Sequence, residues 1–427
     1  MWDGQMAIQV IPLAITALVL GLVASGRFRF DVVAVAGLML VGVLRISPPA
    51  LLFSGFGSPA LFTIMAVLLI SEGITEARLF SGLGQALESR LRKREHQIMG
   101  LALTTSLLSV IMNNVGALSL TLPTAVKMAH RGRLSPGTYT MPMVYGAILG
   151  GTITLIGSAP NIIVSAYREE ILGRPYGMFD FAPHGLAFIF VGLLLWLICR
   201  ACGFSPGGDE PVLLSADKNE DPAPPDRFPQ DILSTPAKRI TLFTVVPGVV
   251  LVSLGVLSPS VAFGTVAVIL VSTGVMNPSA AYKKLDFSVV VFVGAMLGLA
   301  RVLEQTGALS LLTSRMMPMF NHFPPVILVG AVFLVSSLLS ITINNAAAAA
   351  LMAPLTVDLA GAVSLDSLLM AVAAGSCLSM ILPTHQATVI AMGRGWFSPA
   401  RFARTGALLT LVCAAVGSLV ILLIWSG

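Results

Sequence analysis

The sequence has 427 residues, of which 56% are hydrophobic and only 11% are charged, whereas soluble globular chains carry about a quarter charged residues. No water-soluble fold hides that much apolar surface. The net charge of +5 comes from basic residues in short loops without interleaved aromatic residues, which argues against a nucleic-acid partner. The composition therefore predicts an all-α polytopic membrane protein whose solvent is the lipid bilayer.

The chain begins with an apolar run at residues 6–25, about the length of a transmembrane helix. The N-terminus offers Asp3 where a secretory signal has basic residues, and no convincing small-residue cleavage site follows. We therefore expect this run to remain as the first membrane helix. Further runs of this kind recur as far as residues 407–425.

Residues 97–129 are apolar but too short for two crossings and a turn. The arm that ends at Met112 would extend about 24 Å at 1.5 Å per residue, against a hydrocarbon core of about 30 Å. A re-entrant hairpin with Asn113 and Asn114 at its tip is therefore predicted. Basic residues flank it on both sides, which places both of its ends in the cytoplasm.

Residues 150–167, GGTITLIGSAPNIIVSAY, form an apolar segment interrupted by glycine and proline. Proline removes a backbone hydrogen bond, so this pattern predicts a helix that breaks inside the membrane. The later segment 203–239 is rich in Pro, Gly, Asp and Glu and is predicted to be a flexible cytoplasmic linker. Cys199 and Cys202 form an isolated CxxC pair, which we interpret as ordinary small apolar residues.

An internal repeat relates the two halves of the chain. Residues 106–123, SLLSVIMNNVGALSLTLP, match residues 337–354, SLLSITINNAAAAALMAP, without a gap. Residues 375–395, GSCLSMILPTHQATVIAMGRG, supply a second interrupted helix. The sequence thus predicts a first transmembrane repeat at 1–202, the linker at 203–239, and a second repeat at 240–427 with Asn344 and Asn345 at its hairpin tip.

Loop charges indicate how the two repeats are oriented. With five crossings and one hairpin in each half and an external N-terminus, most loop arginines and lysines lie inside, and Arg168, Arg174 and Arg315 are exceptions. An odd number of crossings inverts the second copy, which is the design of secondary transporters. Both termini are then outside the inner (plasma) membrane, and the linker is cytoplasmic.

Helix ends inside a membrane leave backbone groups that can bind ions. Carbonyl ends suit a cation, and amide ends suit an anion. The candidate ligands carry hydroxyl, amide or carbonyl oxygens, which sodium-like cations prefer. The candidate cation ligands are Ser109, Asn113, Asn114, Gly157, Ser340, Asn344, Asn345 and Pro383. The candidate anion-binding residues are Asn113, Asn114, Ser158, Pro160, Asn161, Asn344, Asn345, Thr384, His385 and Thr388.

These residues also have structural interpretations. An asparagine pair can simply cap a buried turn, but its repetition with matching helix breaks favours a functional site. His385 could contact the anion, carry a proton or only form a hydrogen bond. Gly146 with Gly150, and Gly294 with Gly298, have GxxxG spacing, which predicts close helix packing.

IMNNVGALSLTLP, GGTITLIGSAPN, ITINNAAAAALMAP and ILPTHQATVIAMG together resemble the signatures of the divalent anion/sodium symporter family, within the ion transporter superfamily, over nearly the whole chain. The resemblance implies two sodium sites, one per hairpin, with Ser109, Asn113, Asn114 and Gly157 at one and Ser340, Asn344 and Asn345 at the other. It also implies an anion between the tips, sulfate or a di- or tricarboxylate as cargo, elevator-like movement and a homodimer.

The chain departs from that pattern at several positions. Family members commonly have Ser-Asn-Thr at the tip, whereas this chain has Asn113-Asn114-Val115 and Asn344-Asn345-Ala346, so two hydroxyls that could hold a carboxylate are absent from each tip. Thr388 stands where many relatives have asparagine. The linker lacks the cytoplasmic regulatory domains that some relatives insert there.

The leading hypothesis is sodium-coupled symport of a small divalent anion. The alternative within the same fold is an arsenite-type exporter or a sodium/proton antiporter, for which His385 is the strongest titrating candidate and H⁺ would replace or oppose Na⁺. A passive channel is a further possibility. An enzyme is not expected, because the sequence has no HExxH or GxSxG motif and its five histidines are scattered.

Overall fold

The computed structural model describes residues 4–25, 27–77, 79, 91, 93–201, 235–279, 282, 287–308, 310–311, 323–357, 359, 363–382, 388, 391 and 398–426. Regular structure in these residues is entirely helical. The elements are α1 (Gly4–Ala24), α2 (Phe30–Val43), α3 (Pro49–Leu52), η1 (Phe53–Gly57), α4 (Pro59–Glu76), α6 (Arg94–Ser109), α7 (Asn114–Gly132), α8 (Gly137–Gly150), α9 (Ala159–Leu172), α10 (Ala182–Ala201), α11 (Thr235–Ser253), α12 (Pro259–Ser272), α14 (Phe287–Gln305), α16 (Pro325–Thr342), α17 (Asn345–Val357), α18 (Leu365–Cys377) and α20 (Pro399–Trp425).

The same order of elements occurs twice, which confirms the predicted fold class. The first half has α1, α2, the consecutive α3, η1 and α4, the α6/α7 pair, the interrupted α8/α9 pair and α10. The second half has α11, α12, α14, the α16/α17 pair, α18 with the break after it, and α20. By length and composition, six of the described helical segments can cross a membrane, and shorter apolar helices accompany them. Residues 202–234, most of the predicted linker, lie outside the described residues, and α11 begins at Thr235.

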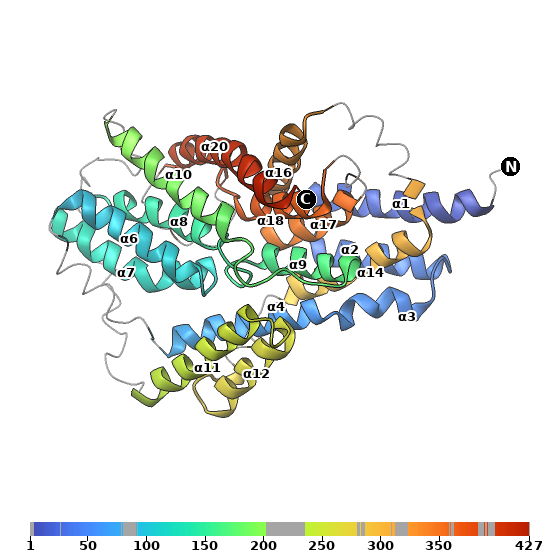
Figure 1. The fold of residues 1–427 in the computed structure, drawn as a ribbon, viewed down its shortest axis with the longest axis horizontal. Helices are drawn as coiled ribbons and strands as arrows, with labels where there is room; N and C mark the ends of the chain where they lie inside the picture. The colour runs from blue at the N-terminus through green and yellow to red at the C-terminus, as the bar shows by residue number, and fades with distance from the viewer. Residues whose placement is uncertain are drawn as a thin grey trace.

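The helices form two groups. We call α6, α7, α8, α9, α10, α16, α17, α18 and α20 the hairpin bundle, and α1, α2, α3, η1, α4, α11, α12 and α14 the flanking helices (Figure 1). The two groups meet where α4 packs against α7 and α9, and where α14 packs against α17. Both repeats contribute to both groups, so the duplication is distributed across the molecule.

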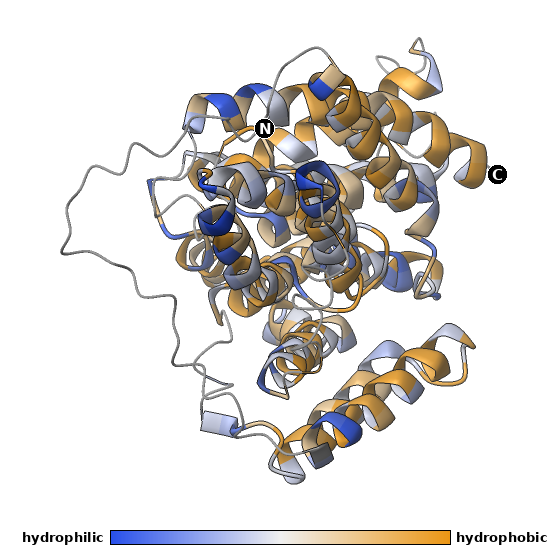
Figure 2. Ribbon diagram, turned by 90° about the vertical axis from the view of Figure 1, so that its left-hand side faces the viewer, coloured by the Kyte–Doolittle hydropathy of each residue, from blue (hydrophilic) through white to orange (hydrophobic). Residues whose placement is uncertain are grey.

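The outer faces of the helices are apolar, as a bilayer requires. Hydrophobic residues predominate along the helices in Figure 2. Large apolar side chains such as Phe190 and Val268 are 67% and 64% exposed, an arrangement that in water would favour aggregation. The described surface therefore fits the prediction that lipid surrounds this chain.

Glycine allows the closest helix contacts, as the GxxxG spacing predicted. A methyl group at Gly150 would come within 2.1 Å of the Ser106 carbonyl oxygen, and one at Gly298 within 2.3 Å of the Leu52 carbonyl oxygen. A side chain at either position would push α8 away from α6, or α14 away from α3. The prediction of close packing at these glycines is confirmed.

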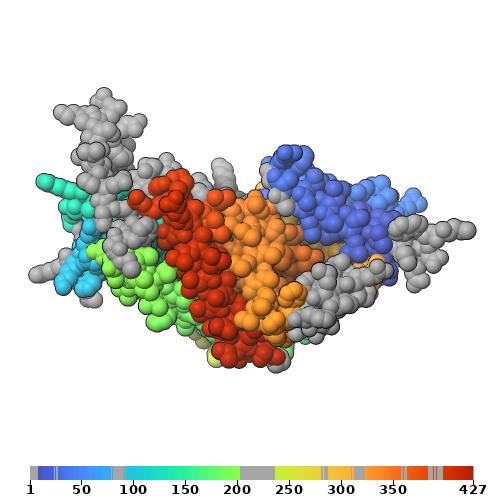
Figure 3. Space-filling model, turned by 90° about the horizontal axis from the view of Figure 1, so that it is seen from above, coloured from blue at the N-terminus to red at the C-terminus, as the bar shows by residue number. Residues whose placement is uncertain are grey.

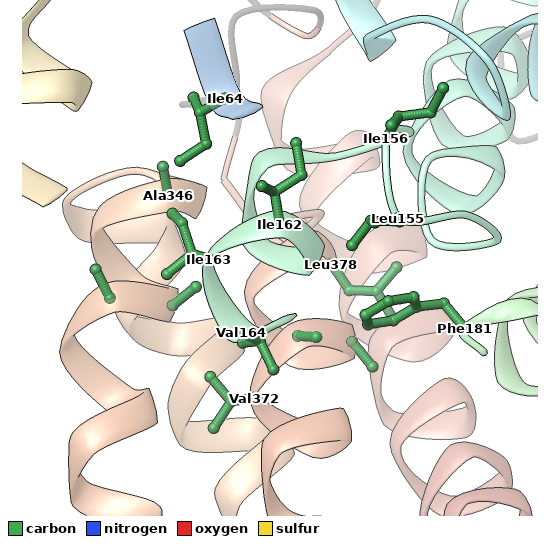
Figure 4. Close-up of a cluster of buried hydrophobic side chains, with 14 of the residues drawn as sticks. Ile64, Leu155, Ile156, Ile162, Ile163, Val164, Phe181, Ala346, Val372 and Leu378 are labelled. Atoms are coloured by element: carbon green, nitrogen blue, oxygen red, sulfur yellow. The ribbon is translucent and has the colours of Figure 1, made fainter. Parts of the chain in front are cut away.

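The two repeats are held together around α9. Ile162, Ile163 and Val164 of α9 lie beside Ala346 of α17 and Val372 of α18 in a buried apolar cluster (Figure 4). The cluster also includes Leu378, which follows α18. The second half of the first interrupted helix therefore packs against the second repeat.

A buried ion pair reinforces this junction. Arg168, treated above as a loop charge, lies on α9 and is only 5% exposed. Its guanidinium donates to both carboxylate oxygens of Asp366 on α18, at 2.7 and 2.8 Å. The Tyr176 hydroxyl also bonds to that carboxylate, at 3.1 Å. Loop charge counting cannot detect such a pair, because its partners are nearly 200 residues apart.

Candidate functional site

The first pair of asparagines lies at a break between two antiparallel helices. α6 ends at Ser109 and α7 begins at Asn114. Asn113 is the N-cap of α7, and its side-chain oxygen accepts a hydrogen bond from the Gly116 N–H at 2.7 Å, which satisfies one of the unpaired amides of the helix start. The chain therefore stops being helical where the sequence predicts it, and Asn113 caps the helix that follows.

Oxygen atoms gather behind the first tip. The Ser109 hydroxyl donates to the Asn114 side-chain oxygen at 2.8 Å, and both residues are buried. Two glycines let the backbone approach this pair: a methyl group at Gly151 would lie 2.4 Å from the Asn114 oxygen, and one at Gly157 would lie 3.0 Å from the Ser109 carbonyl oxygen. The predicted ligands Ser109, Asn114 and Gly157 are thus brought together.

Side-chain hydrogen bonds stabilise the break between α8 and α9. The Asn161 amide donates to the Thr154 carbonyl oxygen at 2.7 Å and to the Gly151 carbonyl oxygen at 3.3 Å. The Thr154 hydroxyl accepts the Gly157 N–H at 3.1 Å and also bonds to the Val110 carbonyl oxygen of the hairpin. These bonds replace those that a continuous helix would make. They also tie the break to the hairpin tip.

The two predicted residues that start α9 are also buried. Ser158 occupies the N-cap position and is 7% exposed, and its side chain makes no capping bond. Pro160 lies in the first turn, where the missing N–H of proline costs nothing. The α9 amide groups therefore begin at the break, and its N-terminal end supplies partial positive charge there.

The second tip repeats the first. α16 ends at Thr342, α17 begins at Asn345, and the Asn344 side-chain oxygen accepts the Ala347 N–H at 2.8 Å. The Ser340 hydroxyl lies 2.8 Å from the Asn345 side-chain oxygen, the same distance as in the first half. Corresponding residues thus make the corresponding contacts in both repeats.

The Ser340 hydroxyl lies near more hydrogen-bond acceptors than it can donate to. Its hydroxyl lies 2.8 Å from the Asn345 oxygen and 2.7 Å from the Ser376 carbonyl oxygen, yet it has one hydrogen to donate. The Ser379 hydroxyl lies 3.1 Å from the same Asn345 oxygen. An excess of neutral oxygens over hydrogens suits a cation, whose charge these oxygens would share.

Beyond α18 the structure describes only part of the second break. Pro383, Thr384 and His385 lie outside the described residues. Thr388 is fully buried, and neither its hydroxyl nor that of Ser376 has a hydrogen-bond partner among the described residues. Two orphaned hydroxyls in an interrupted helix are polar groups that a ligand could satisfy.

The two breaks approach each other. The Cys377 thiol, at the end of α18, lies 3.6 Å from the Asn161 side-chain oxygen. Asn161 therefore contacts the first break through its nitrogen and the second repeat through its oxygen. This contact brings the interrupted helices of the two halves together at one place.

Several polar residues of this region were not singled out by the sequence. Thr154, Ser376 and Ser379 lie within the interrupted segments, so a search for every hydroxyl there would have found them. Ser71 had no such signal: it belongs to α4, and its hydroxyl accepts the Asn113 N–H at 3.2 Å. Only the packing of α4 against the first hairpin reveals that contact.

Comparisons with known proteins agree with this architecture. A family model described as citrate transporter (CitMHS) matches residues 19–375. An uncharacterised transporter of Synechocystis sp., sll0640, is 30% identical over 49% of this chain and 33% of its own length. The probable sodium/sulfate cotransporter 3 of Chlamydomonas reinhardtii is 24% identical over 34% of this chain and 17% of its own length. The matches thus span about a third or less of these curated relatives.

A longer match and a solved structure extend the comparison. An uncharacterised transporter of Haemophilus influenzae is 23% identical over 85% of this chain and 80% of its own length. The crystal structure of the YdaH transporter of Alcanivorax borkumensis superposes with a TM-score of 0.57 at 14% sequence identity, covering 98% of this chain and 99% of that one. At that identity the likeness concerns the fold alone.

Proposed function

The chain belongs to the citrate transporter family, and we propose that it is a secondary transporter that couples the movement of a small divalent anion to sodium. The observation that carries this proposal is the pair of matching oxygen clusters, Ser109 with Asn114 and Ser340 with Asn345, each at a break between helices. Sodium/sulfate cotransporters among the relatives support sodium as the coupling ion.

In this proposal one sodium ion binds at each tip. The first would take the Ser109 and Asn114 oxygens together with backbone oxygens of Gly151 and Gly157, two glycines whose backbones approach Asn114 and Ser109. The second would take Ser340, Asn345 and the Ser376 carbonyl oxygen. All of these ligands are neutral, so a bound cation brings positive charge that attracts an anion.

The anion would bind between the two tips. α7, α9 and α17 each begin at a tip or break, and their N-terminal ends contribute partial positive charge there. Ser158, Pro160 and Asn161 of the first break would line this site, with Thr384, His385 and Thr388 of the second. Sulfate is the first candidate and a di- or tricarboxylate the second, because helix ends bind oxyanions well and the tips lack additional hydroxyls.

Movement of the hairpin bundle against the flanking helices would give alternating access. The two tips, the interrupted helices and their ion pair all belong to the bundle, so both ion clusters would travel together. Polar contacts across the boundary include the Ser71–Asn113 hydrogen bond and an ion pair between Arg301 of α14 and Glu170 of α9. Such contacts can break and reform without disrupting either group. In this proposal both hairpins are re-entrant, and the protein is a homodimer.

Uptake into proteoliposomes tests the proposal. Purified protein would be tested with labelled sulfate, citrate and succinate under an inward sodium gradient, with potassium as the control. We expect saturable uptake of at least one anion that falls by ten-fold or more without sodium. Equal uptake in sodium and potassium for every anion would overturn sodium coupling, and flux that never saturates would indicate a channel.

A further inference from the structure

The Asn161 side chain links the two interrupted helices. Its amide nitrogen lies 2.7 Å from the Thr154 carbonyl oxygen and 3.3 Å from the Gly151 carbonyl oxygen. Its amide oxygen lies 3.6 Å from the sulfur of Cys377. Because two acceptors surround the nitrogen, these contacts fix the direction in which the amide points. The amide oxygen is therefore directed at the second repeat.

The hydrogen bonds of Asn161 are those of a positioning residue. An asparagine side chain carries two N–H donors, and both are used by carbonyl oxygens of the first break. No N–H of this amide is left for an anion. Asn161 and Cys377 are both fully buried. Asn161 thus borders the proposed anion site but holds the protein rather than the anion.

The nitrogen side of Asn161 leads to the first oxygen cluster. Gly151 accepts one of its hydrogen bonds. A methyl group on Gly151 would lie only 2.4 Å from the Asn114 side-chain oxygen, so the two residues are in close contact. The Gly151 carbonyl and the Asn114 side chain are both ligands in the proposed first sodium site. A shift of Gly151 therefore reaches Asn161 through one hydrogen bond.

The oxygen side of Asn161 leads to the second cluster. Cys377 is the last residue of α18. The residue before it, Ser376, accepts a hydrogen bond from Ser340 at 2.7 Å through its carbonyl oxygen, which is a proposed ligand of the second sodium ion. The Ser158 side chain, at the start of α9, is another polar neighbour of the thiol. The thiol thus fixes the end of α18 directly beside a proposed sodium ligand.

The contact between Asn161 and Cys377 lies inside the hairpin bundle. α9, α16, α17 and α20 all pack against α18, and α10 (green), α20 (red) and α16 (orange) lie side by side on the face shown in Figure 3. A thiol is a weak donor, but without it a buried amide oxygen would lose a hydrogen-bond partner in a low-dielectric interior. Loss of the thiol should therefore release the Asn161 oxygen from α18.

We infer that Asn161 and Cys377 are positioning residues that couple the two sodium sites, an inference that rests on the proposed function. A sodium ion at the first tip fixes the Gly151 carbonyl and, through it, the Asn161 amide. The amide oxygen then holds Cys377, so that the neighbouring Ser376 carbonyl is already in place for the second ion. Ordering completed by the first ion does not oppose the second, and this favours cooperative binding although the two ions repel each other.

Binding of labelled sodium to the purified full chain, without any anion, tests the inference. We expect the wild type to bind about two ions per chain with a Hill coefficient of about 1.5–2, since the upper limit is the number of sites. In Cys377→Ala the number of bound ions should be unchanged, whereas the Hill coefficient should fall to about 1. An unchanged number of ions also shows that the variant is folded and that both oxygen clusters are intact.

A second variant separates the hydrogen bond from the packing of the side chain. Cys377→Val has a volume close to that of cysteine but no donor, so it should lose cooperativity even if Cys377→Ala fails to fold. Cys413→Ala and Cys413→Val are the matched controls. Cys413 lies on α20, is also fully buried, and its thiol makes no hydrogen bond within the described part of the chain. Both control variants should bind sodium with the Hill coefficient of the wild type.

The outcomes distinguish this inference from the proposed function. A wild type that binds no sodium would overturn sodium coupling and the inference together. If the wild type and both Cys377 variants bind two ions with the same Hill coefficient, the inference is wrong and the proposed function stands. Loss of one bound ion in the Cys377 variants would make this residue part of a sodium site, and equal loss of cooperativity in the Cys413 variants would indicate a packing effect. Either result would also overturn the inference.

Discussion

At the scale of single residues, the two asparagines of each tip make different contacts. Asn113 and Asn344 use their side-chain oxygens to cap the following helix. The next asparagines, Asn114 and Asn345, direct theirs toward a serine of the preceding helix. The two asparagines of each tip therefore have different structural roles. The first caps the helix that follows the break, and the second completes the oxygen cluster with the serine.

Gly157→Ala tests the first cluster. The added methyl group would lie 2.7 Å from the Gly151 carbonyl oxygen and 3.0 Å from that of Ser109, so it occupies the space proposed for a cation. We expect sodium-dependent uptake to fall by at least about ten-fold, equivalent to about 1.4 kcal/mol. Gly21→Ala is the control, since a methyl group there meets nothing within 4 Å. Unchanged sodium dependence in Gly157→Ala would remove this glycine from the site.

Ser340→Ala tests the second cluster. It removes the hydroxyl that lies between Asn345 and Ser376, and we expect the sodium concentration for half-maximal uptake to rise about ten-fold, the effect of losing about 1.4 kcal/mol. Ser336→Ala, one turn earlier, serves as the control because its hydroxyl bonds only to Val332 of its own helix in the described structure. Titration of uptake with sodium measures both variants, and an equal shift in the two would indicate a structural effect.

At the scale of elements, interrupted helices are joined across the repeats. α9 packs against α17 and α18, and the Arg168–Asp366 pair lies at that junction. The arginine also donates to the carbonyl oxygens of Arg174 and Pro175 and lies over the Tyr176 ring at 4.4 Å. Buried charged groups with this many hydrogen-bond partners fix one specific arrangement of the helices. Arg168 therefore acts as part of the helix packing, not as a loop charge.

Removal of one partner of this pair should cost more than removal of both. Arg168→Met leaves Asp366 buried without its cation, and we expect a loss of about 3–5 kcal/mol in the free energy of unfolding. The double variant Arg168→Met/Asp366→Leu should recover part of that loss, because no buried charge remains unpaired. Denaturant unfolding of the purified protein measures both variants. A double variant that is as unstable as the sum of its single variants would contradict the role of the pair.

At the scale of the whole molecule, the hairpin bundle and the flanking helices are the two bodies that would move. In Figure 1 the first hairpin, α6 with α7, projects to the left beyond the end of α4. The tip of that hairpin meets α4 at Ser71, close to the end of the helix at Glu76. The bundle is thus displaced along the flanking helices toward one side.

A disulfide across the boundary should stop transport. In a background with the native cysteines replaced, Ser71→Cys with Gly116→Cys joins α4 to α7, because a Cβ at Gly116 would lie 3.4 Å from the Ser71 hydroxyl oxygen. We expect oxidation to reduce uptake by at least ten-fold and a reductant to restore it. Thr105→Cys with Thr121→Cys is the control, because it links α6 to α7 inside the bundle, where the two hydroxyls are 2.9 Å apart. Full uptake after both links form would argue against elevator movement.

The sequence by itself determined the membrane class, the duplication and the positions of the breaks at Asn113–Asn114 and Asn344–Asn345. These features are local: hydropathy, proline and helix-capping residues act over one or two turns, so they can be read along the chain. It also placed Ser109, Asn114, Ser340 and Asn345 among the candidate ligands at the two tips.

Only the tertiary structure decided which distant residues complete those clusters. Ser71 reaches the first tip from α4, Ser376 and Ser379 surround the second, and Arg168 meets Asp366 from the other repeat. The contact between the two interrupted helices likewise exists only because α9 and α18 pack together. Such contacts depend on how helices pack across the whole bundle, and the pattern of one segment does not encode its partner in another.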